Sequence, residues 1–272
     1  MNTENLPSLF VSHGAPTLAI EQTDAVAFLQ SLGAQIERPR SILCVSAHWM
    51  TAVPTLSAAP QPETIHDFGG FPASLYRMRY DAPGAPGLAA RVKGLLDGAG
   101  IEAGLSPRRG LDHGAWIPLM LMYPEADIPV TQLSVQTEGG PAAHFQLGRA
   151  LAPLRNEGVL VLATGGVVHN LSRIGREGAP PPEWAAQFED WLNRKITDGA
   201  YEELINYRRL APSAALAHPT EEHLLPLFVA MGAGSALERD EQPLAAETLY
   251  RGWTHGSLSM AAYGFGRALR RD

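Results

Sequence analysis

The sequence contains a single cysteine, Cys44, among its 272 residues. One thiol excludes an internal disulfide and disfavours a metal cluster built on thiolates, and it is typical of a cytoplasmic protein. The sequence also has no HExxH motif, the pair of helix-borne histidines with which metalloproteases bind zinc. A structural zinc site with cysteine pairs and a protease site of that kind are therefore not expected.

Clusters of basic residues and long apolar runs are also scarce. The chain has a net charge of -7, and its arginine pairs are confined to 108–109, 208–209 and 270–271. A surface that binds nucleic acid needs a concentrated basic patch, so nucleic acid is not an expected partner. No stretch approaches the ~20 apolar residues of a membrane span, and residues 1–9 are too polar for a signal peptide. We expect no membrane association.

The composition and patterning indicate one folded α/β domain. Hydrophobic residues make up 45% of the chain and charged residues 18%, which is ordinary for a globular protein. Strand and helix patterns alternate, so we expect a single domain over 1–272 with a central mixed β-sheet flanked by helices on both faces. The predicted strands are 8–12, 41–47, 55–58, 76–80, 102–105, 129–135, 158–164 and 257–265. The predicted helices are 19–33, 87–99, 114–122, 142–154, 183–197, 201–206 and 223–231.

Three of the nine histidines follow predicted strands. His13 follows strand 8–12, His48 follows strand 41–47, and His169 lies just beyond strand 158–164. A single histidine at a strand end is more often a hydrogen-bonded structural residue. Functional groups of α/β sheets collect where strand ends converge, however, and three histidines there indicate a metal site, a proton-transfer site or both. Ligation by histidine or carboxylate with open positions is typical of non-haem Fe(II) oxygen chemistry.

A set of short motifs then points to a family. In chain order they are SHGAP (12–16), SAHW (46–49), DFGGFP (67–72), LDHGAW (111–116), VVHNL (167–171), HPTEEHLLPL (218–227) and GSLSM (256–260). Together they resemble the class III extradiol ring-cleavage dioxygenases, in particular the DODA type. The resemblance runs over nearly the whole chain.

The resemblance implies an enzyme that opens a catechol-type ring, DOPA-like or a related ortho-diphenol, with molecular oxygen. It implies a mononuclear Fe(II), which zinc can replace in the isolated protein. By motif, the metal ligands are His13, His48 and His223, and His169 matches the family's acid–base histidine. His113 matches a pocket histidine with a role in catalysis.

Several alternatives stay open at this point. Glu222 can replace His223 as third ligand, since more distant extradiol enzymes use a glutamate there and neighbouring helical side chains, about 100° apart, do not share a direction. The same histidines would also suit a zinc hydrolase that activates water. Candidate substrate contacts are His66, Trp49 and Phe71, although aromatic residues near motifs often only pack in the core. A homo-oligomer is compatible with the sequence.

Overall fold

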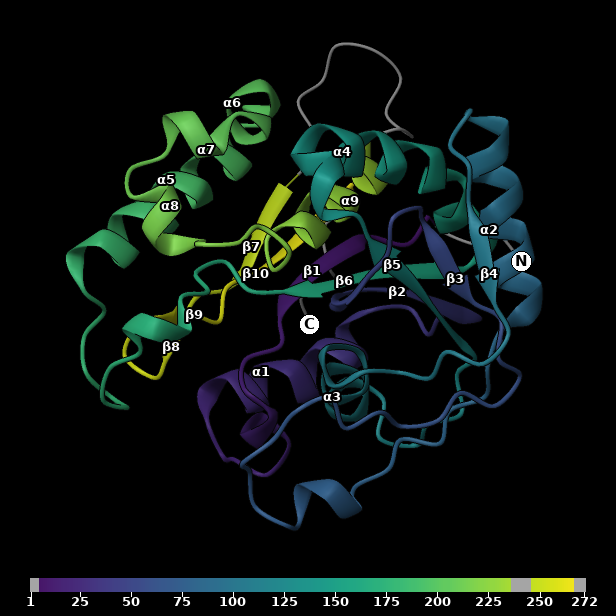
Figure 1. Cartoon of the computed structure of the whole chain (residues 1–272), viewed down its shortest axis with the longest axis horizontal. Coiled ribbons are helices and arrows are strands. Elements are labelled where there is room, and N and C mark those ends of the chain that lie inside the picture. Colours follow the sequence, from purple (N-terminus) through teal and green to yellow (C-terminus); the bar gives the residue numbers. More distant parts are fainter. Residues whose placement is uncertain (1–4, 236–245, 267–272) are drawn as a thin grey trace.

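The centre of the molecule is an eight-stranded sheet, shown in Figure 1. The computed structural model describes residues 5–235 and 246–266. The strand order is β4-β3-β5-β2-β6-β1-β10-β7, and β8 and β9 form a separate two-stranded ladder. The strands are β1 (Ser8–Ser12), β2 (Ser41–Met50), β3 (Thr55–Ser57), β4 (Gly104–Ser106), β5 (Val130–Val135), β6 (Val159–Gly165), β7 (Ala246–Tyr250), β8 (Trp253–Thr254), β9 (Leu258–Ser259) and β10 (Ala262–Phe265).

The middle of this sheet is parallel and its flanks are mixed. Strands β5, β2, β6 and β1 run parallel, whereas β10 is antiparallel to β1 and to β7. At the other end β3 is antiparallel to β5. The central strands are buried on both faces, as their continuous apolar runs require. Alternate residues of β2 serve different cores: Leu43 and Val45 pack in one, Ile42 and Cys44 in the other.

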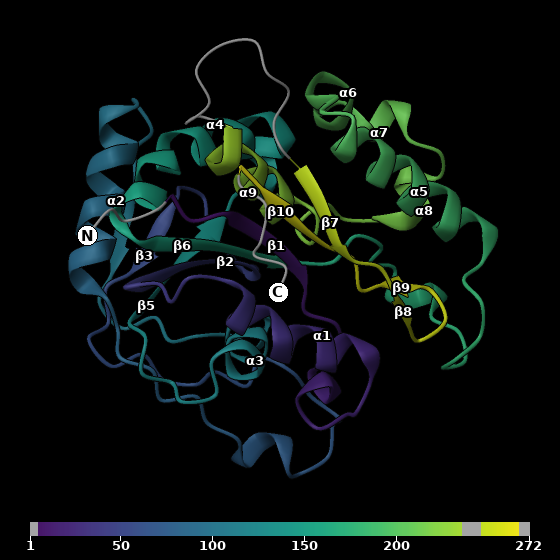
Figure 2. The same ribbon diagram turned by 180° about the vertical axis from the view of Figure 1, so that it is seen from behind.

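Helices cover both faces of the sheet, as Figures 1 and 2 show. On one face lie α2 (Pro86–Gly98), α4 (Gly140–Leu151) and α9 (Leu225–Ser235), and on the other α1 (Asp24–Leu32) and α3 (His113–Met122). Beside β7 and β10 lies a group of four helices, α5 (Glu183–Thr197), α6 (Tyr201–Ile205), α7 (Tyr207–Leu210) and α8 (Ala214–Ala217). The predicted class, one α/β domain with a mixed sheet between helical layers, is confirmed.

Several local predictions are wrong, among them the start of helix 19–33, since α1 begins at Asp24. Residues 76–80 form no strand: a 3-10 turn covers Leu75–Arg77, because an alternating pattern makes a strand only where a neighbouring strand can pair with it. Predicted strand 257–265 is divided into β9 and β10. Helix α9 begins at Leu225 rather than at His223, since Pro226 favours the first turn of a helix. In the described ranges no helix has both the length and the apolar character needed to cross a membrane.

Candidate metal centre and active site

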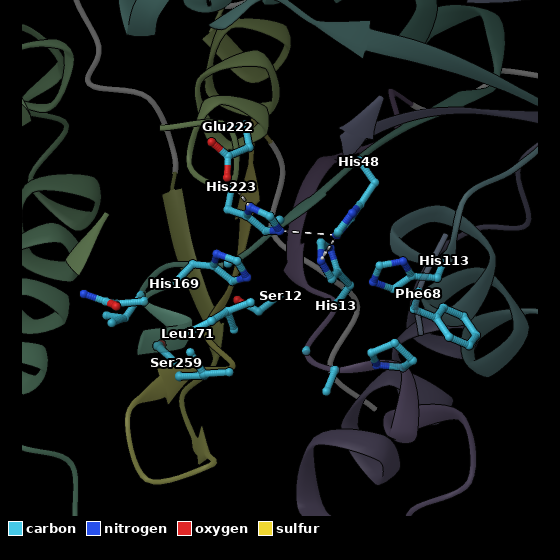
Figure 3. A pocket seen from close by; sticks show the side chains of 18 of the residues that line it. Ser12, His13, His48, Phe68, His113, His169, Leu171, Glu222, His223 and Ser259 are labelled. Carbon is cyan, nitrogen blue, oxygen red and sulfur yellow. Dashed lines mark hydrogen bonds and ion pairs between the residues drawn. The ribbon is translucent and has the colours of Figure 1, made fainter. Parts of the chain in front are cut away.

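Five histidines gather where the parallel strands end, around a pocket of about 640 Å³. His13 follows β1, His48 lies near the end of β2, and His169 follows β6. His113 begins α3, and His223 immediately precedes α9. Figure 3 shows the imidazoles of His13, His48 and His223 directed toward one another. Segments far apart in the sequence thus deliver one kind of side chain to one place.

The Nε2 atoms of three rings converge closely. Nε2 of His48 lies 3.1 Å from Nε2 of His13 and 3.3 Å from Nε2 of His223. Two nitrogens bound to one ion at ~2.0–2.1 Å with tetrahedral angles are roughly 3.4 Å apart. A neutral imidazole nitrogen has one lone pair, so Nε2 of His48 cannot accept hydrogen bonds from both neighbours. A shared cation fits this arrangement better than hydrogen bonding does.

Carboxylates lie behind two of these rings. Nδ1 of His223 donates to Oε1 of Glu222 at 2.9 Å, and Nδ1 of His48 is 3.4 Å from Oδ2 of Asp67. A carboxylate at Nδ1 holds the proton there and leaves the Nε2 lone pair free for a metal. Glu222 therefore lies on the far side of the His223 ring from the converging Nε2 atoms (Figure 3).

Two sets of possible ligand atoms can be drawn here, each within 4.8 Å: one joins His113 to His13 and His48, and one joins His169 and Glu222 to His223. Neither set includes the 3.3 Å approach of His48 to His223. Oε1 of Glu222 is already engaged with Nδ1 of His223 at 2.9 Å, whereas Nε2 of His48 lies within 3.3 Å of Nε2 of both His13 and His223. The geometry thus favours His13, His48 and His223 as the ligand set.

Burial keeps the converging histidines neutral. Loss of solvent lowers the pKa of His13 and of His223 well below the ordinary value, and the surrounding imidazoles lower both further. Burial is also the largest cause of the lowered pKa of His48, where Asp112 and Asp67 act in the opposite direction. A neutral imidazole has the free lone pair that a metal ligand needs.

Glycines make room for the histidine segments. A Cβ on Gly165, the last residue of β6, would lie 2.1 Å from the carbonyl oxygen of His223, which also accepts a hydrogen bond from Gly166 N–H. A Cβ on Gly114 would lie 2.6 Å from Oγ of Ser46 and 2.9 Å from Cδ2 of His48. These contacts explain why glycine occupies position 165 at the end of β6 and position 114 in the motif LDHGAW.

The rest of the pocket suits an aromatic ring. His169 stacks on His223 with ring centroids 3.4 Å apart and an interplanar angle of 8°. Phe68 and Phe71, whose ring centroids are 5.5 Å apart, line the pocket, and Leu171 and Leu258 are among the other lining residues. Burial lowers the pKa of His169, so its ring is neutral near pH 7 and available as a base.

Comparison with known proteins identifies the family. The model of the catalytic LigB subunit of aromatic ring-opening dioxygenases matches residues 7–266. The chain belongs to this LigB family. LigB extradiol dioxygenases are metal-dependent, in agreement with the cluster of three histidines.

Its relatives agree with this assignment. Proteins named 4,5-DOPA dioxygenase extradiol from Portulaca grandiflora and Beta vulgaris are 48% and 45% identical to the chain, covering 95% of it and 95% and 96% of their own lengths. The Escherichia coli protein of that name is 41% identical, over 98% of the chain and 97% of its own. The crystal structure of an uncharacterized protein from Escherichia coli K12 matches with a TM-score of 0.79 at 36% identity, covering 96% of this chain and all of that one.

The LigB-family chain is thus an extradiol ring-cleaving dioxygenase, as the motifs predict. It acts on an aromatic substrate with O2. The comparisons give no support to the zinc-hydrolase alternative.

Two predicted substrate contacts lie outside the LigB-family pocket. Trp49 is on the opposite face of β2 from His48, because strand side chains alternate, and the guanidinium of Arg109 lies over its ring at 5.1 Å. Nε2 of His66 hydrogen-bonds to the carbonyl oxygen of Met78 at 3.0 Å, and its ring packs behind Phe68. Proximity to a motif in the sequence was a poor guide for both. Phe71 does line the pocket.

Two acidic residues were missed by the sequence analysis although both stand in quoted motifs. Asp112 is fully buried and accepts hydrogen bonds from Oγ of Ser46 at 2.6 Å, from Nη2 of Arg109 at 2.8 Å and from Gln132. Through Ser46, whose Oγ also accepts from His48 N–H at 3.2 Å, this network supports the end of β2. Asp67 contacts both His48 and His113. The available signal was that Asp112 directly precedes the motif histidine His113 and that Asp67 opens the motif DFGGFP.

Proposed function

We propose that the protein is an Fe(II)-dependent extradiol dioxygenase that opens the ring of DOPA or a related ortho-diphenol, with His13, His48 and His223 as metal ligands. The observation that carries the proposal is the convergence of three Nε2 atoms, at 3.1 and 3.3 Å, on one wall of the pocket. DOPA is the substrate in the names of the plant and Escherichia coli relatives. The pocket volume falls within the range of roughly 300–1,000 Å³ usual for small-molecule sites.

The ligand set suits a divalent ion and an anionic substrate. Three neutral imidazoles leave the charge of the ion uncompensated, which favours a catecholate. When bound, Fe(II) supplies Lewis acidity toward the catechol hydroxyls and one-electron chemistry toward O2. Zinc can occupy the same ligands without that redox chemistry. Glu222 orients His223 from the Nδ1 side rather than replacing it.

His169 and His113 are proposed to handle protons on the substrate. His169, neutral and stacked on His223 in the pocket wall, accepts a proton from a substrate hydroxyl and returns it as the ring opens. His113 has its Nδ1 engaged with Asp67, so its Nε2 is left to hydrogen-bond the substrate. Phe68 and Phe71 hold the ring and exclude water from that side.

The test is reconstitution of the apoprotein with Fe(II) without air, addition of L-DOPA or a small panel of catechols, and then admission of air. Oxygen uptake and the yellow ring-opened product are recorded, with Zn(II) as the parallel control. We expect turnover with Fe(II) and not with Zn(II), its abolition in His48→Ala and a large loss in His169→Ala. Metal binding without oxygen uptake on any catechol of the panel would contradict the proposal.

A further inference from the structure

We propose that Asp67 is a positioning residue: it sets the ring orientation of His48 and His113 and determines which ring nitrogen of each carries hydrogen. It also links the aromatic wall of the pocket, formed by Phe68 and Phe71, to the metal centre. The inference rests on the proposed assignment of His48 as a metal ligand. It concerns a residue outside the proposed ligands and acid–base groups.

Asp67 directs its two carboxylate oxygens at two different histidines. Oδ1 accepts hydrogen bonds from the backbone N–H and from Nδ1 of His113, both at 2.9 Å. Oδ2 lies 3.4 Å from Nδ1 of His48. The ring centroids of His48 and His113 are 4.0 Å apart, so one carboxylate bridges a pair of neighbouring rings.

These contacts decide where each ring carries its proton. A carboxylate can only accept, so Nδ1 of His113 carries hydrogen, and the nearby Oδ2 favours hydrogen on Nδ1 of His48 as well. Nε2 of each neutral ring then keeps a lone pair. For His48 that lone pair points to the place where Nε2 of His13 and of His223 converge. For His113 it is an acceptor for a substrate hydroxyl in the pocket. One side chain thus prepares a metal ligand and a substrate contact at the same time.

Asp67 also begins the segment that forms the aromatic wall. The next residue, Phe68, stands edge-on to His113 with centroids 5.6 Å apart, and Phe71 packs against Phe68 at 5.5 Å. Between them a Cβ at Gly69 or Gly70 would meet nothing within 4 Å. The wall is therefore anchored through Asp67 at its start rather than through packing at the two glycines.

A purely structural role is the competing explanation, since one bond of Asp67 goes to the backbone of His113. The α3 N-terminus has its own cap, however: Oδ1 of Asp112 accepts from Ala115 N–H at 3.2 Å. The Asp67 side chain is also 24% exposed, so its replacement by asparagine leaves no charge buried. The readout must therefore be metal binding rather than folding alone.

The experiment titrates the apoproteins of wild type, Asp67→Asn, Asp67→Glu and Asp81→Asn with Co(II) under argon, following visible absorption, and records thermal unfolding of each. Asp81→Asn is the matched control, because Asp81 is a neighbouring exposed aspartate that pairs with Arg79 instead of a histidine. In Asp67→Asn the side-chain amide has only one oxygen that can accept a hydrogen bond. Its NH₂ group would therefore face the Nδ1–H of one of the two histidines, donor against donor. Asp67→Glu keeps the carboxylate.

We expect Asp67→Asn to bind Co(II) about 10- to 100-fold more weakly, with an altered absorption spectrum and a melting temperature close to wild type. Asp67→Glu should lie between Asp67→Asn and wild type, and Asp81→Asn should match wild type. Equal affinity and spectrum for Asp67→Asn and Asp81→Asn would overturn the positioning role and leave the proposed function standing. A Co(II) spectrum unchanged in His48→Ala would instead overturn the proposed metal site, and this inference with it.

Discussion

The histidines of the site are held in two different ways. His13 and His48 belong to the parallel part of the sheet: His48 lies within β2, and the backbone N–H of His13 donates to the carbonyl of Gly165 at the end of β6 at 3.1 Å. Backbone hydrogen bonds between strands fix where these two side chains start. The orientation of the His48 ring also depends on side-chain contacts, among them the approach of Oδ2 of Asp67 to its Nδ1 at 3.4 Å.

His223 is carried differently, by an irregular segment before α9. The backbone of this segment touches the end of β6 through Gly165 and Gly166, and its ring is held by Glu222. The position of His223, a proposed ligand outside regular structure, therefore depends on the close approach of its backbone to Gly165 and on side-chain hydrogen bonds. The comparison indicates that the position of His223, the proposed third ligand, depends on separate supports, which can be removed one at a time.

The largest effect is expected from Gly165→Ala. The new Cβ would fall 2.1 Å from the His223 carbonyl oxygen, so backbone must shift and the third ligand must leave its place. We expect a loss of stability of about 3 kcal/mol and the loss of tight Co(II) binding, measured by urea unfolding and by metal titration.

Gly94→Ala is the control for the glycine change. Gly94 lies in α2, where an added Cβ meets nothing within 4 Å, so alanine should stabilise the protein by roughly 0.5–1 kcal/mol and leave metal binding unchanged. Tight Co(II) binding by Gly165→Ala would show that the irregular segment can shift and still present His223. It would contradict the idea that His223 is held less securely than the histidines of the sheet.

A smaller effect is expected from Glu222→Gln. Glutamine can still accept from Nδ1 of His223, but without the negative charge that strengthens the bond. We expect metal affinity to fall about 10-fold with little change in stability, measured by Co(II) titration and thermal unfolding. Glu221→Gln is the matched control, because the Glu221 carboxylate accepts from the Tyr207 hydroxyl at 2.7 Å rather than from a histidine. A loss as great in Glu221→Gln would mean that general charge, not orientation, is responsible.

The same contrast explains what the sequence could predict. Buried strands such as β2 and β6 show continuous apolar runs, so the fold class and the histidines at strand ends could be predicted from local pattern. Strand β7 (AETLY) is half-buried throughout and shows no alternation, so its pairing with β10 was missed. Such pairings depend on partners distant in the chain.

The direction in which each side chain of the site points could not be predicted from the local sequence pattern either. Spacing alone left Glu222 and His223 as alternatives, because it does not say which of the two side chains faces the cluster. The motif resemblance favoured His223, and the geometry now supports that choice, which stays a prediction until metal binding is measured. Trp49 and His66 stand beside motif residues yet point elsewhere. Residues adjacent in the sequence rarely share a direction on a strand or a turn.

An effect of a different kind, on the pH dependence of stability, concerns His218, which lies near the irregular segment and bonds to the chain after β6. Its Nε2 donates to the carbonyl of Val167 at 2.7 Å, and burial is the main reason that its pKa is lowered from 6.5 to about 4. The unfolded chain binds a proton below about pH 6.5 while the folded protein does not, so this residue's contribution to stability is complete above that pH and is lost as pH falls toward 4. Glutamine can keep the bond to Val167 without titrating.

We therefore expect the loss of unfolding free energy between pH 7 and pH 5 to be about 2 kcal/mol smaller in His218→Gln than in wild type, measured by urea unfolding at each pH. Buried histidines that do not interact with His218 contribute equally to both proteins, whereas His218 helps to lower the pKa of His223, so the difference reports His218 together with its effect on His223. Identical pH profiles for the two proteins would show that His218 is readily protonated in the folded state. Because Nε2–H can donate to Val167 in either protonation state, that result would leave the hydrogen bond in place and remove only the pH dependence that burial imposes.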